Sequence, residues 1–361
     1  MPKPIGVAMI GCGGIALANH IPGLALCPQA KLVALCDSNP ATLDRAKQAS
    51  GVSTTFSDPE QAIAHPDVDA IIIATPNVVH APIAHAAIRA GKHVMSEKPI
   101  AMNYPEAAEM VRAADAAGVR HLTAFTYRFV PAMRYMSHLV KKGFIGTPYH
   151  FRAQRFQDWG TRNLAWRQVK ALAATGELGD MLSHRIDFAH FLMGPMSRLV
   201  ARLRQYVFDR GGSPSDLDDW VSIIADFENG ATGVLESTKL ATGRGEGGKS
   251  PDVCEVNGSE GTLVYQVTKP NQIGIGRKGA ETLVMEDVPE EFLKHPRSPR
   301  DVRQGDPVVT FRYDQNFEFI DAIANNRPAS PSLADGARCQ AVMDAAVKSD
   351  ETRAWVDVPK V

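Results

Sequence analysis

The segment from Ile5 to Ala16 constrains the fold of this chain more than any other. The mainly apolar run Ile5–Ile10 is typical of a buried strand, and Gly11-Cys12-Gly13-Gly14-Ile15-Ala16 follows it directly, ahead of a helical segment. In this position a G-x-G-x-x-A pattern allows a tight turn, a close approach of the backbone to a pyrophosphate, and a helix N-terminus aimed at the phosphates. The pattern therefore predicts a dinucleotide-binding turn formed by Gly11, Gly13, Gly14 and Ile15.

The rest of the first 125 residues alternates short apolar runs with helical patterns, as expected for a parallel sheet with crossover helices. The further strands are expected at Lys31–Cys36, Ala70–Ala74, His93–Ser96 and His121–Ala124, and the helices at Ala41–Ser50, Val79–Ala90 and Pro105–Ala117. These elements predict an α/β fold with an N-terminal Rossmann domain, that is, a doubly wound parallel sheet.

An acidic residue marks the end of the second expected strand. Asp37 follows Ala16 by about 20 residues, the distance at which dinucleotide folds place an acid on the adenosine ribose hydroxyls. A carboxylate there repels a 2′-phosphate, so NAD is favoured over NADP, although Ser38 and Asn39 leave NADP possible. The alternative is that Asp37 only caps the helix that begins near Pro40.

From about Pro131 the pattern changes to longer strands. They are expected at Tyr149–Phe156, Arg198–Phe208, Val221–Phe227 and Ala231–Lys239, with helices at Gly179–Leu192 and Leu333–Lys348 and loops at Thr242–Pro251 and Pro289–Pro307. Asn229-Gly230 is typical of a hairpin turn. The chain is therefore expected to divide into a dinucleotide-binding domain, residues 1–127, and a C-terminal α+β domain, residues 128–361, built on a mostly antiparallel open sheet.

Composition excludes several classes of function. Among 361 residues, 39 Lys and Arg nearly balance 40 Asp and Glu, and the formal net charge of -1 gives no field that would attract nucleic acid. The five cysteines are scattered and are expected to be reduced thiols. No apolar stretch reaches the ~18 residues of a membrane span, and no signal peptide is recognised, so a cytoplasmic protein is expected. No metal site is expected, since His80 and His85 do not share a helix face.

Two motifs carry a resemblance to a known family. Ala74-Thr75-Pro76-Asn77 is followed by His80, and Glu97-Lys98-Pro99 comes after the fifth strand. With these motifs the chain resembles the family of glucose-fructose oxidoreductase, inositol dehydrogenase and rhizopine catabolism protein (Gfo/Idh/MocA), from its first strand to its closing helix. The resemblance implies that Thr75, Asn77, His80, Glu97 and Lys98 line the cofactor, with Lys98 beside the nicotinamide and a cis peptide before Pro99.

A third motif of that family, Asp-x-Gly-x-His-x-x-Asp, is matched by Asp180, His184 and Asp187, with Leu182 in place of the usual glycine. Asp180 and His184 are four residues apart and share a helix face, so the carboxylate can orient the imidazole. The resemblance implies a catalytic group of Lys98, Asp180 and His184, in which His184 is the preferred base. It also implies that Trp166 and Arg167 approach the nicotinamide end of the cofactor.

The expected activity is hydride transfer between a nicotinamide cofactor, NAD or possibly NADP, and a hydroxyl-bearing carbon of a sugar, cyclitol or related polyol. Two alternatives remain open. One is a glycoside-cleaving enzyme in which tightly held NAD oxidises a sugar carbon transiently, and the other is a sugar or dinucleotide sensor without activity. The resemblance further implies a homodimer or homotetramer that pairs through the open sheet.

Overall fold

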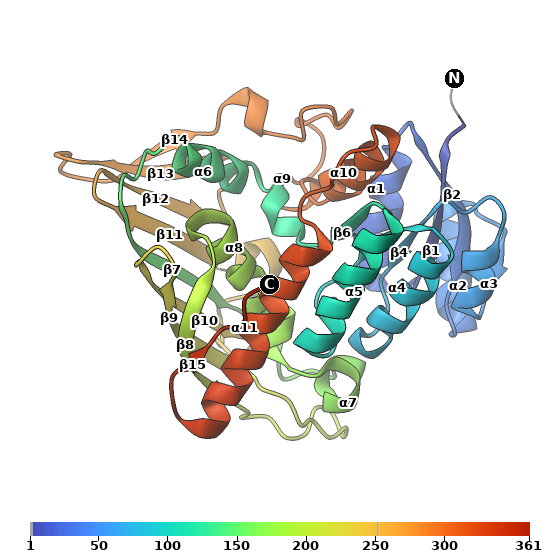
Figure 1. Cartoon of the computed structure of the whole chain (residues 1–361), viewed down its shortest axis with the longest axis horizontal. Coiled ribbons are helices and arrows are strands. Elements are labelled where there is room, and N and C mark those ends of the chain that lie inside the picture. Colours follow the sequence, from blue (N-terminus) through green and yellow to red (C-terminus); the bar gives the residue numbers. More distant parts are fainter. Residues whose placement is uncertain (1–2, 251) are drawn as a thin grey trace. The chain divides into compact units, whose positions relative to one another are not determined.

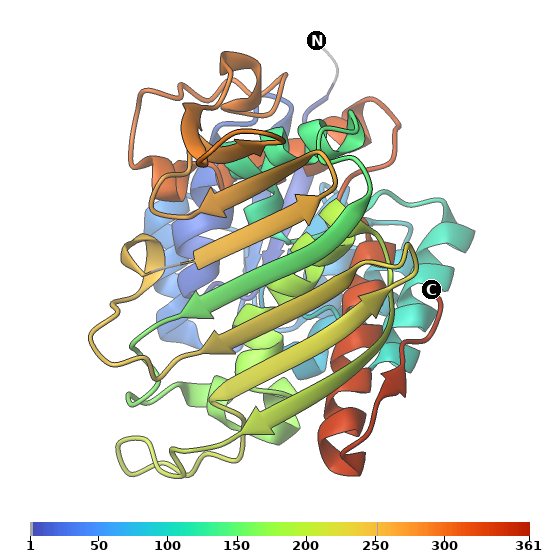
Figure 2. The ribbon, with the colours of Figure 1, turned by 90° about the vertical axis from the view of Figure 1, so that its left-hand side faces the viewer.

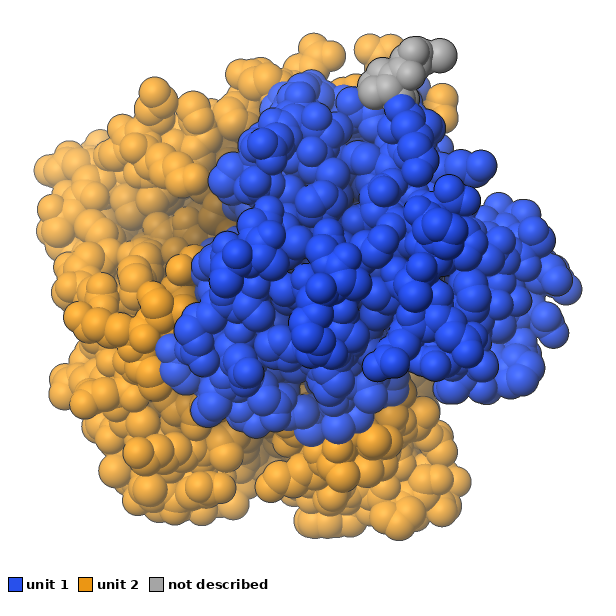
Figure 3. Space-filling model, turned by 45° about the vertical axis from the view of Figure 1, so that its right-hand side comes forward, with its two compact units in different colours: residues 1–126, 295–301, 310–337 blue, residues 127–294, 302–309, 338–361 orange. Residues whose placement is uncertain are grey.

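The computed structural model describes residues 3–250 and 252–361. Pro251, the end of one expected loop, lies outside the described residues, as do Met1 and Pro2. The chain forms two compact units, shown in different colours in Figure 3. The first contains the residues up to Thr126 together with His295–Asp301 and Thr310–Ala337, and the second contains Tyr127–Lys294, Val302–Val309 and Arg338–Val361.

The first unit is built on a six-stranded parallel sheet. Its strand order is β3-β2-β1-β4-β5-β6, so the order reverses between β1 and β4, where folds of this type place their ligand. Every residue of β1 after Ile5 is buried, because helices cover both faces of the sheet. The strands are β1 (Ile5–Ile10), β2 (Ala30–Cys36), β3 (Thr55–Phe56), β4 (Ala70–Ile73), β5 (His93–Ser96) and β6 (His121–Thr123).

Two separate apolar cores flank this sheet, and Figure 1 labels the helices that contribute to them. Side chains of α3 (Pro59–Ala64), α4 (His80–Arg89) and α5 (Tyr104–Ala117) form the core on one face. The other core contains side chains of α1 (Ile21–Ala25), α2 (Pro40–Ser50) and α10 (Tyr313–Ala324). Since α10 comes from near the end of the chain, the first unit is not continuous in sequence.

The second unit contains a nine-stranded sheet in the order β14-β13-β12-β11-β7-β10-β9-β8-β15 (Figure 2). Its pairings are antiparallel except that of β7 with β10, which is parallel. The strands are β7 (Pro148–Phe156), β8 (Met196–Arg204), β9 (Trp220–Phe227), β10 (Thr232–Thr238), β11 (Asp252–Gly258), β12 (Gly261–Gln266), β13 (Gln272–Arg277), β14 (Val284–Asp287) and β15 (Val356–Asp357).

Helices cover one face of this larger sheet. The helix α6 (Pro131–Lys141) packs on β12 and β13, and α8 (Ser183–Met193) packs on β7, β10 and β11. Side chains of β7 therefore alternate: Phe151 and Ala153 are buried, whereas Arg152 is exposed on the opposite face. Figure 2 shows that opposite face turned toward the viewer, without a helix of the second unit on it.

Shorter helical segments complete the chain. Two are π-helical turns, η1 (Ala16–His20) and η5 (Leu178–Leu182), which lead directly into α1 and α8. The long helix α11 (Leu333–Thr352) begins in the first unit and ends in the second. The remaining segments are η2 (Asn77–Val79), η3 (Thr126–Phe129), η4 (Ala165–Gln168), η6 (Gly247–Lys249), η7 (Glu290–Phe292), α7 (Lys170–Ala173) and α9 (Pro307–Thr310).

The predicted fold class is confirmed, with differences at the ends of elements. The strand expected at Arg198–Phe208 is instead β8, Met196–Arg204. It ends earlier because the carboxylate of Asp219 accepts the N–H groups of Tyr206 and Val207, at 2.8 and 2.9 Å, and removes them from strand pairing. Sequence reasoning missed α6, α10 and the strands β11 to β14.

The five cysteines are free thiols, as predicted, and all of them are buried. Burial raises the pKa of Cys12, Cys27 and Cys36 to about 12, so these thiols are poor nucleophiles at neutral pH. Among the helices of the described residues, none combines the length and the apolar character that a membrane span requires.

Candidate active site

The glycine turn lies at the carboxyl end of β1. Gly11 has a φ of +89°, and a Cβ there would lie 2.5 Å from the carbonyl group of Ala74, so no other residue fits. In contrast, a Cβ on Gly13 or Gly14 would meet no atom within 4 Å. The turn therefore leaves an open cradle over its second and third glycines, with Ile15 at the start of η1, and a pyrophosphate fits such a cradle.

Asp37 lies beside this turn, at the end of β2. One carboxylate oxygen accepts the N–H of Cys12 at 2.8 Å, and the other accepts the N–H of Asn39 at 2.8 Å. The helix α2 is capped by the side chain of Asn39, which accepts the N–H groups of Ala41 and Thr42. The capping role considered for Asp37 thus belongs to Asn39. Asp37 and the exposed Ser38 directly follow β2, the strand next to the glycine turn.

The ends of β4 and β5 carry the next group of predicted residues. Thr75 follows β4, and Asn77 is buried at the start of η2. His80 is fully buried, and its ring bridges the two segments: Nδ1 lies 2.7 Å from the carbonyl oxygen of Pro99, and Nε2 lies 2.9 Å from that of Thr75. The peptide between Lys98 and Pro99 is cis, as predicted.

Glu97 and Lys98 follow β5 and are partly buried. The carboxylate of Glu97 contacts Nε2 of His20 at 2.9 Å and accepts the backbone N–H of Lys98 at 3.3 Å. Burial raises the pKa of Glu97, whereas His20, Lys98 and His80 lower it. The lowering is the larger effect, so the pKa of Glu97 lies below its usual value. Sequence reasoning did not include His20 in the site. Its position shortly after the glycine turn was the one feature of the sequence that could have indicated it.

The predicted residues of the second unit lie on η5 and α8. Asp180 is in the π-helical turn, and His184, which is 5% exposed, is in the first turn of α8. The ring of Tyr127 packs edge-on against the imidazole, with ring centroids 4.7 Å apart. Leu182, in the place of the family's glycine, is fully buried.

Asp187, the last residue of that motif, has a structural partner. Its carboxylate accepts hydrogen bonds from Nε of Arg128 at 2.8 and 3.0 Å, in a buried ion pair. Arg128 follows Tyr127 in the chain, so this ion pair fixes the segment that packs against His184. Trp166 and Arg167 lie on η4, where the guanidinium of Arg167 stacks on the indole at 4.3 Å from the ring centroid.

A second buried group of titratable side chains lies close to Asp180. Glu177 immediately precedes η5, is fully buried, accepts a hydrogen bond from Ser237, and lies 3.7 Å from Nζ of Lys239. Burial raises the pKa of Glu177 to about 8; Lys239 and Ser237 offset part of the rise, and Asp180 adds to it. Sequence reasoning missed Glu177, although an acidic residue in a mainly apolar stretch is a signal for a buried, functional carboxylate.

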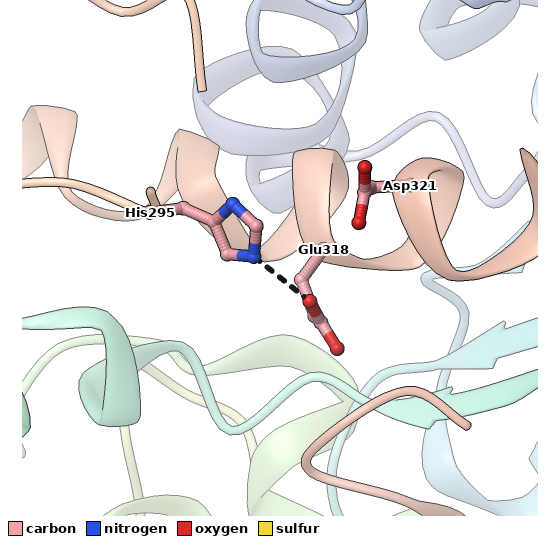
Figure 4. A group of neighbouring side chains, drawn as sticks. All are labelled: His295, Glu318 and Asp321. Carbon is pink, nitrogen blue, oxygen red and sulfur yellow. Dashed lines mark hydrogen bonds and ion pairs between the residues drawn. The ribbon is translucent and has the colours of Figure 1, made fainter. Parts of the chain in front are cut away.

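One group of described residues has the composition of a metal site: His295, Glu318 and Asp321, with ligand atoms within 4.8 Å of one another (Figure 4). The negative charges of its two carboxylates are already balanced by arginines. Arg327 donates to Glu318 at 2.8 and 2.6 Å and to Asp321 at 3.1 Å, and Arg297 pairs with Asp321. A metal ion would have to displace Arg327, so the group acts as an ion-pair network that joins α10 to residues 295–297 and 327.

The glycine cradle at the reversal of strand order, with an acid on the neighbouring strand, defines a dinucleotide-binding domain, here accompanied by an open-sheet domain. Family models agree: residues 5–125 match the oxidoreductase family with an NAD-binding Rossmann fold, and residues 133–264 match the GFO/IDH/MocA C-terminal domain. The chain belongs to the Gfo/Idh/MocA family of oxidoreductases, and its first domain is an NAD-binding Rossmann domain.

Individual relatives support the same assignment. Levoglucosan dehydrogenase of Pseudarthrobacter phenanthrenivorans is 31% identical over 99% of both chains. Myo-inositol 2-dehydrogenase of Thermotoga maritima is 28% identical over 65% of this chain and 69% of its own. Among solved structures, a levoglucosan dehydrogenase in complex with NADH and levoglucosan superposes with a TM-score of 0.91 at 30% identity, covering 99% of this chain and 100% of that chain.

Proposed function

We propose that this protein is an NAD-dependent dehydrogenase that oxidises a hydroxyl-bearing carbon of a cyclic sugar or cyclitol. The observation that carries the proposal is the full-length similarity to levoglucosan dehydrogenase, at 31% identity and 99% coverage. The proposed residues agree with it, because the cradle at Gly13 and Gly14 and the carboxylate of Asp37 suit a dinucleotide.

Each cofactor contact is assigned from its place in the fold. We assign Gly11, Gly13, Gly14 and Ile15 to the pyrophosphate and Asp37 with Ser38 to the adenosine ribose. We assign Thr75, Asn77, Glu97, Lys98, Trp166 and Arg167 to the nicotinamide half. His80 acts indirectly in this scheme, since both ring nitrogens are engaged by the carbonyl groups of Thr75 and Pro99.

In the proposed reaction NAD supplies the hydride acceptor, and the side chains of the chain manage the proton. His184 removes the proton from the substrate hydroxyl while Lys98 holds the oxygen on which charge develops. Asp180 holds the imidazole or a neighbouring substrate hydroxyl. The edge-on contact of Tyr127 limits the rotation of the His184 ring, which keeps the base in one orientation.

The substrate class is proposed from the relatives whose names specify it. They include levoglucosan dehydrogenase, D-apiose dehydrogenase and myo-inositol 2-dehydrogenase. The test is a panel of anhydrosugars, aldoses and cyclitols with NAD, monitored for NADH absorbance. Release of an aglycone from glycosides without net NADH would instead support the glycoside-cleaving alternative, and the absence of both reactions would contradict an enzymatic function.

Two further assignments belong to this proposal. Residues 1–127 form the dinucleotide-binding domain, and residues 128–361 form the domain that binds the substrate and makes the subunit contact, with Trp166 and Arg167 as its contribution to the cofactor. We also place the enzyme in the cytoplasm, which agrees with five buried cysteines that form no disulfide.

A further inference from the structure

His20 is a fully buried residue whose two ring nitrogens both face oxygen atoms. Nδ1 lies 3.0 Å from Oδ1 of Asn316 on α10, and Nε2 lies 2.9 Å from Oε1 of Glu97. The amide of Asn316 is oriented by its nitrogen, which donates to the carbonyl oxygen of Asn19 at 3.4 Å. Room for this amide exists because residue 23 is glycine: a Cβ there would lie 2.4 Å from the amide nitrogen. Oδ1 is therefore the atom that faces the imidazole, and it can only accept.

This arrangement fixes where protons must be. A neutral imidazole has one N–H, and Asn316 takes it at Nδ1. The contact at Nε2 then needs a second proton, which belongs either to an imidazolium facing a carboxylate or to a carboxylic acid facing a neutral ring. The backbone N–H of Lys98, which Glu97 accepts, and the charge of the Lys98 side chain, which lowers the pKa of Glu97, both favour the ionised carboxylate and hence the imidazolium.

Glu97 transmits this arrangement to the proposed catalytic lysine. Its first oxygen contacts His20, and its second accepts the backbone N–H of Lys98 at 3.3 Å. The next peptide is held from the other side, where His80 contacts the carbonyl oxygen of Pro99 at 2.7 Å. Lys98 thus lies in a turn anchored by two buried histidines.

We propose that His20 is a positioning residue: as an imidazolium it keeps Glu97 ionised and oriented, and through Glu97 it fixes the peptide that carries Lys98. The catalytic part of this inference rests on the proposed dehydrogenase function. The inferred protonation state of His20 is independent of that function.

The charged groups around Glu97 agree with this role. His20 reaches it from η1, His80 from α4, and Lys98 from its own turn. Burial lowers the pKa of His80, whereas the carbonyl oxygens of Pro99 and Thr75, which face its two ring nitrogens, favour its charged form. On α10, Asp314 is paired with Arg300 at 2.9 Å. His20, which contacts the carboxylate directly, is supported by Lys98 and His80 in offsetting the burial of the Glu97 carboxylate.

The first experiment measures the protonation of His20 directly, in the wild-type protein without substrate. Nitrogen NMR of histidine-labelled protein, with the His20 signals identified by their loss in His20→Gln, is expected to show both ring nitrogens protonated at pH 7. In Glu97→Gln the acceptor charge is gone, and the ring is expected to become neutral. A neutral His20 in the wild type at pH 7 would overturn the proposal, whether or not the protein oxidises any sugar.

The second experiment measures the pH dependence of turnover. His20→Ala is expected to reduce kcat at pH 7 at least ~10-fold. Since Glu97 then lacks its hydrogen-bond donor, the acidic limb of the profile of kcat against pH is expected to move to higher pH by about one unit. His20→Gln keeps a donor for Glu97 and is expected to restore most of the activity. The control His93→Asn changes a histidine of β5 whose contact is the N–H of Arg120, and it should leave the profile unchanged.

The two experiments separate the inference from the proposed function. An acid limb that stays in place in His20→Ala, with or without a uniform loss of rate, would show a merely structural role and overturn the positioning role. If no polyol is oxidised by the wild type, the proposed function fails, while the NMR result still decides the state of His20.

Discussion

The carboxylate of Asp37 accepts the backbone N–H of Cys12 at 2.8 Å, and this bond ties the end of β2 to the glycine turn after β1. The same carboxylate is proposed to bind the adenosine ribose. We therefore expect Asp37 to have two roles, one in shaping the glycine turn and one in the choice between NAD and NADP, and both can be measured.

We expect the wild type to use NAD with a higher kcat/KM than NADP, because the Asp37 carboxylate repels a 2′-phosphate. Asp37→Ala should narrow this preference and raise the KM for both cofactors, since Cys12 loses its acceptor. Asp44→Ala, an exposed acid on α2, is the matched control and should change neither value. A wild-type kcat/KM with NADP that equals or exceeds the value with NAD would contradict the assignment of Asp37.

A further prediction concerns Lys98 and His184. Since loss of one positioned acid or base costs ~10²–10⁴-fold in rate, Lys98→Ala and His184→Ala should each reduce kcat at least ~100-fold. Binding of NADH, measured by fluorescence titration, should weaken little, because its phosphate and adenosine contacts lie elsewhere. The double variant should lose far less than the product of the single losses, as expected for residues that act together. Near-normal turnover in His184→Ala would exclude it as the base.

Glu177 predicts a dependence of stability on pH. Its pKa of about 8 in the folded protein lies above the ordinary value of 4.5, so the folded state binds the proton more tightly than the unfolded state. Stability therefore falls as the pH rises from about 4.5 to about 8. Glu177→Gln has no carboxyl group to ionise, so this loss of stability with rising pH should disappear. The Tm of the variant should match that of the wild type near pH 5. At pH 8 it should be higher by roughly 2–4 °C for each kcal/mol by which the free energy of unfolding of the variant exceeds that of the wild type. The exposed control Glu281→Gln should follow the wild type at every pH.

The uncovered face of the nine-stranded sheet predicts self-association. Ile224 on β9 is 48% exposed and lies directly between Val200 on β8 and Val234 on β10, so three apolar side chains form a strip across neighbouring strands. We expect a dimer or tetramer in light scattering, and Ile224→Lys should convert it to monomers. Phe208→Ser, which removes a side chain that is 68% exposed but lies outside the sheet, is the control. A monomeric wild type at micromolar concentration would refute this prediction.

Local pattern made much of the first unit predictable. Buried strands such as β1 and β5 appear as short apolar runs, and the glycine turn between β1 and η1 is a contiguous motif, so both could be placed without tertiary information. The strand β3, only two residues long, has no detectable periodicity. The second unit was less predictable, because β13 (Gln272–Arg277) is interrupted by two glycines and β14 is only four residues long.

The site was predictable where a motif marked it and unpredictable where long-range contacts define it. The Asp-x-x-x-His-x-x-Asp spacing located His184, but it could not show that Asp187 pairs with Arg128, 59 residues earlier in the chain. Likewise, the ring of His20 is oriented by its contact with Asn316, which is 296 residues away in the chain. Only tertiary structure brings such pairs together, and no local pattern encodes them.

The contribution of α10 to the first unit also has a consequence for synthesis on the ribosome. Phe317, Phe319 and Ile320 complete the apolar core against α1 and α2, so that core cannot close when residue 127 emerges. The nascent Rossmann sheet must wait for about 200 further residues, at a synthesis rate of ~5–20 residues per second, before it acquires its last layer. A fragment that ends at residue 127 would expose that apolar face, and it is therefore expected to need a chaperone or to aggregate, whereas the full-length chain supplies its own cover.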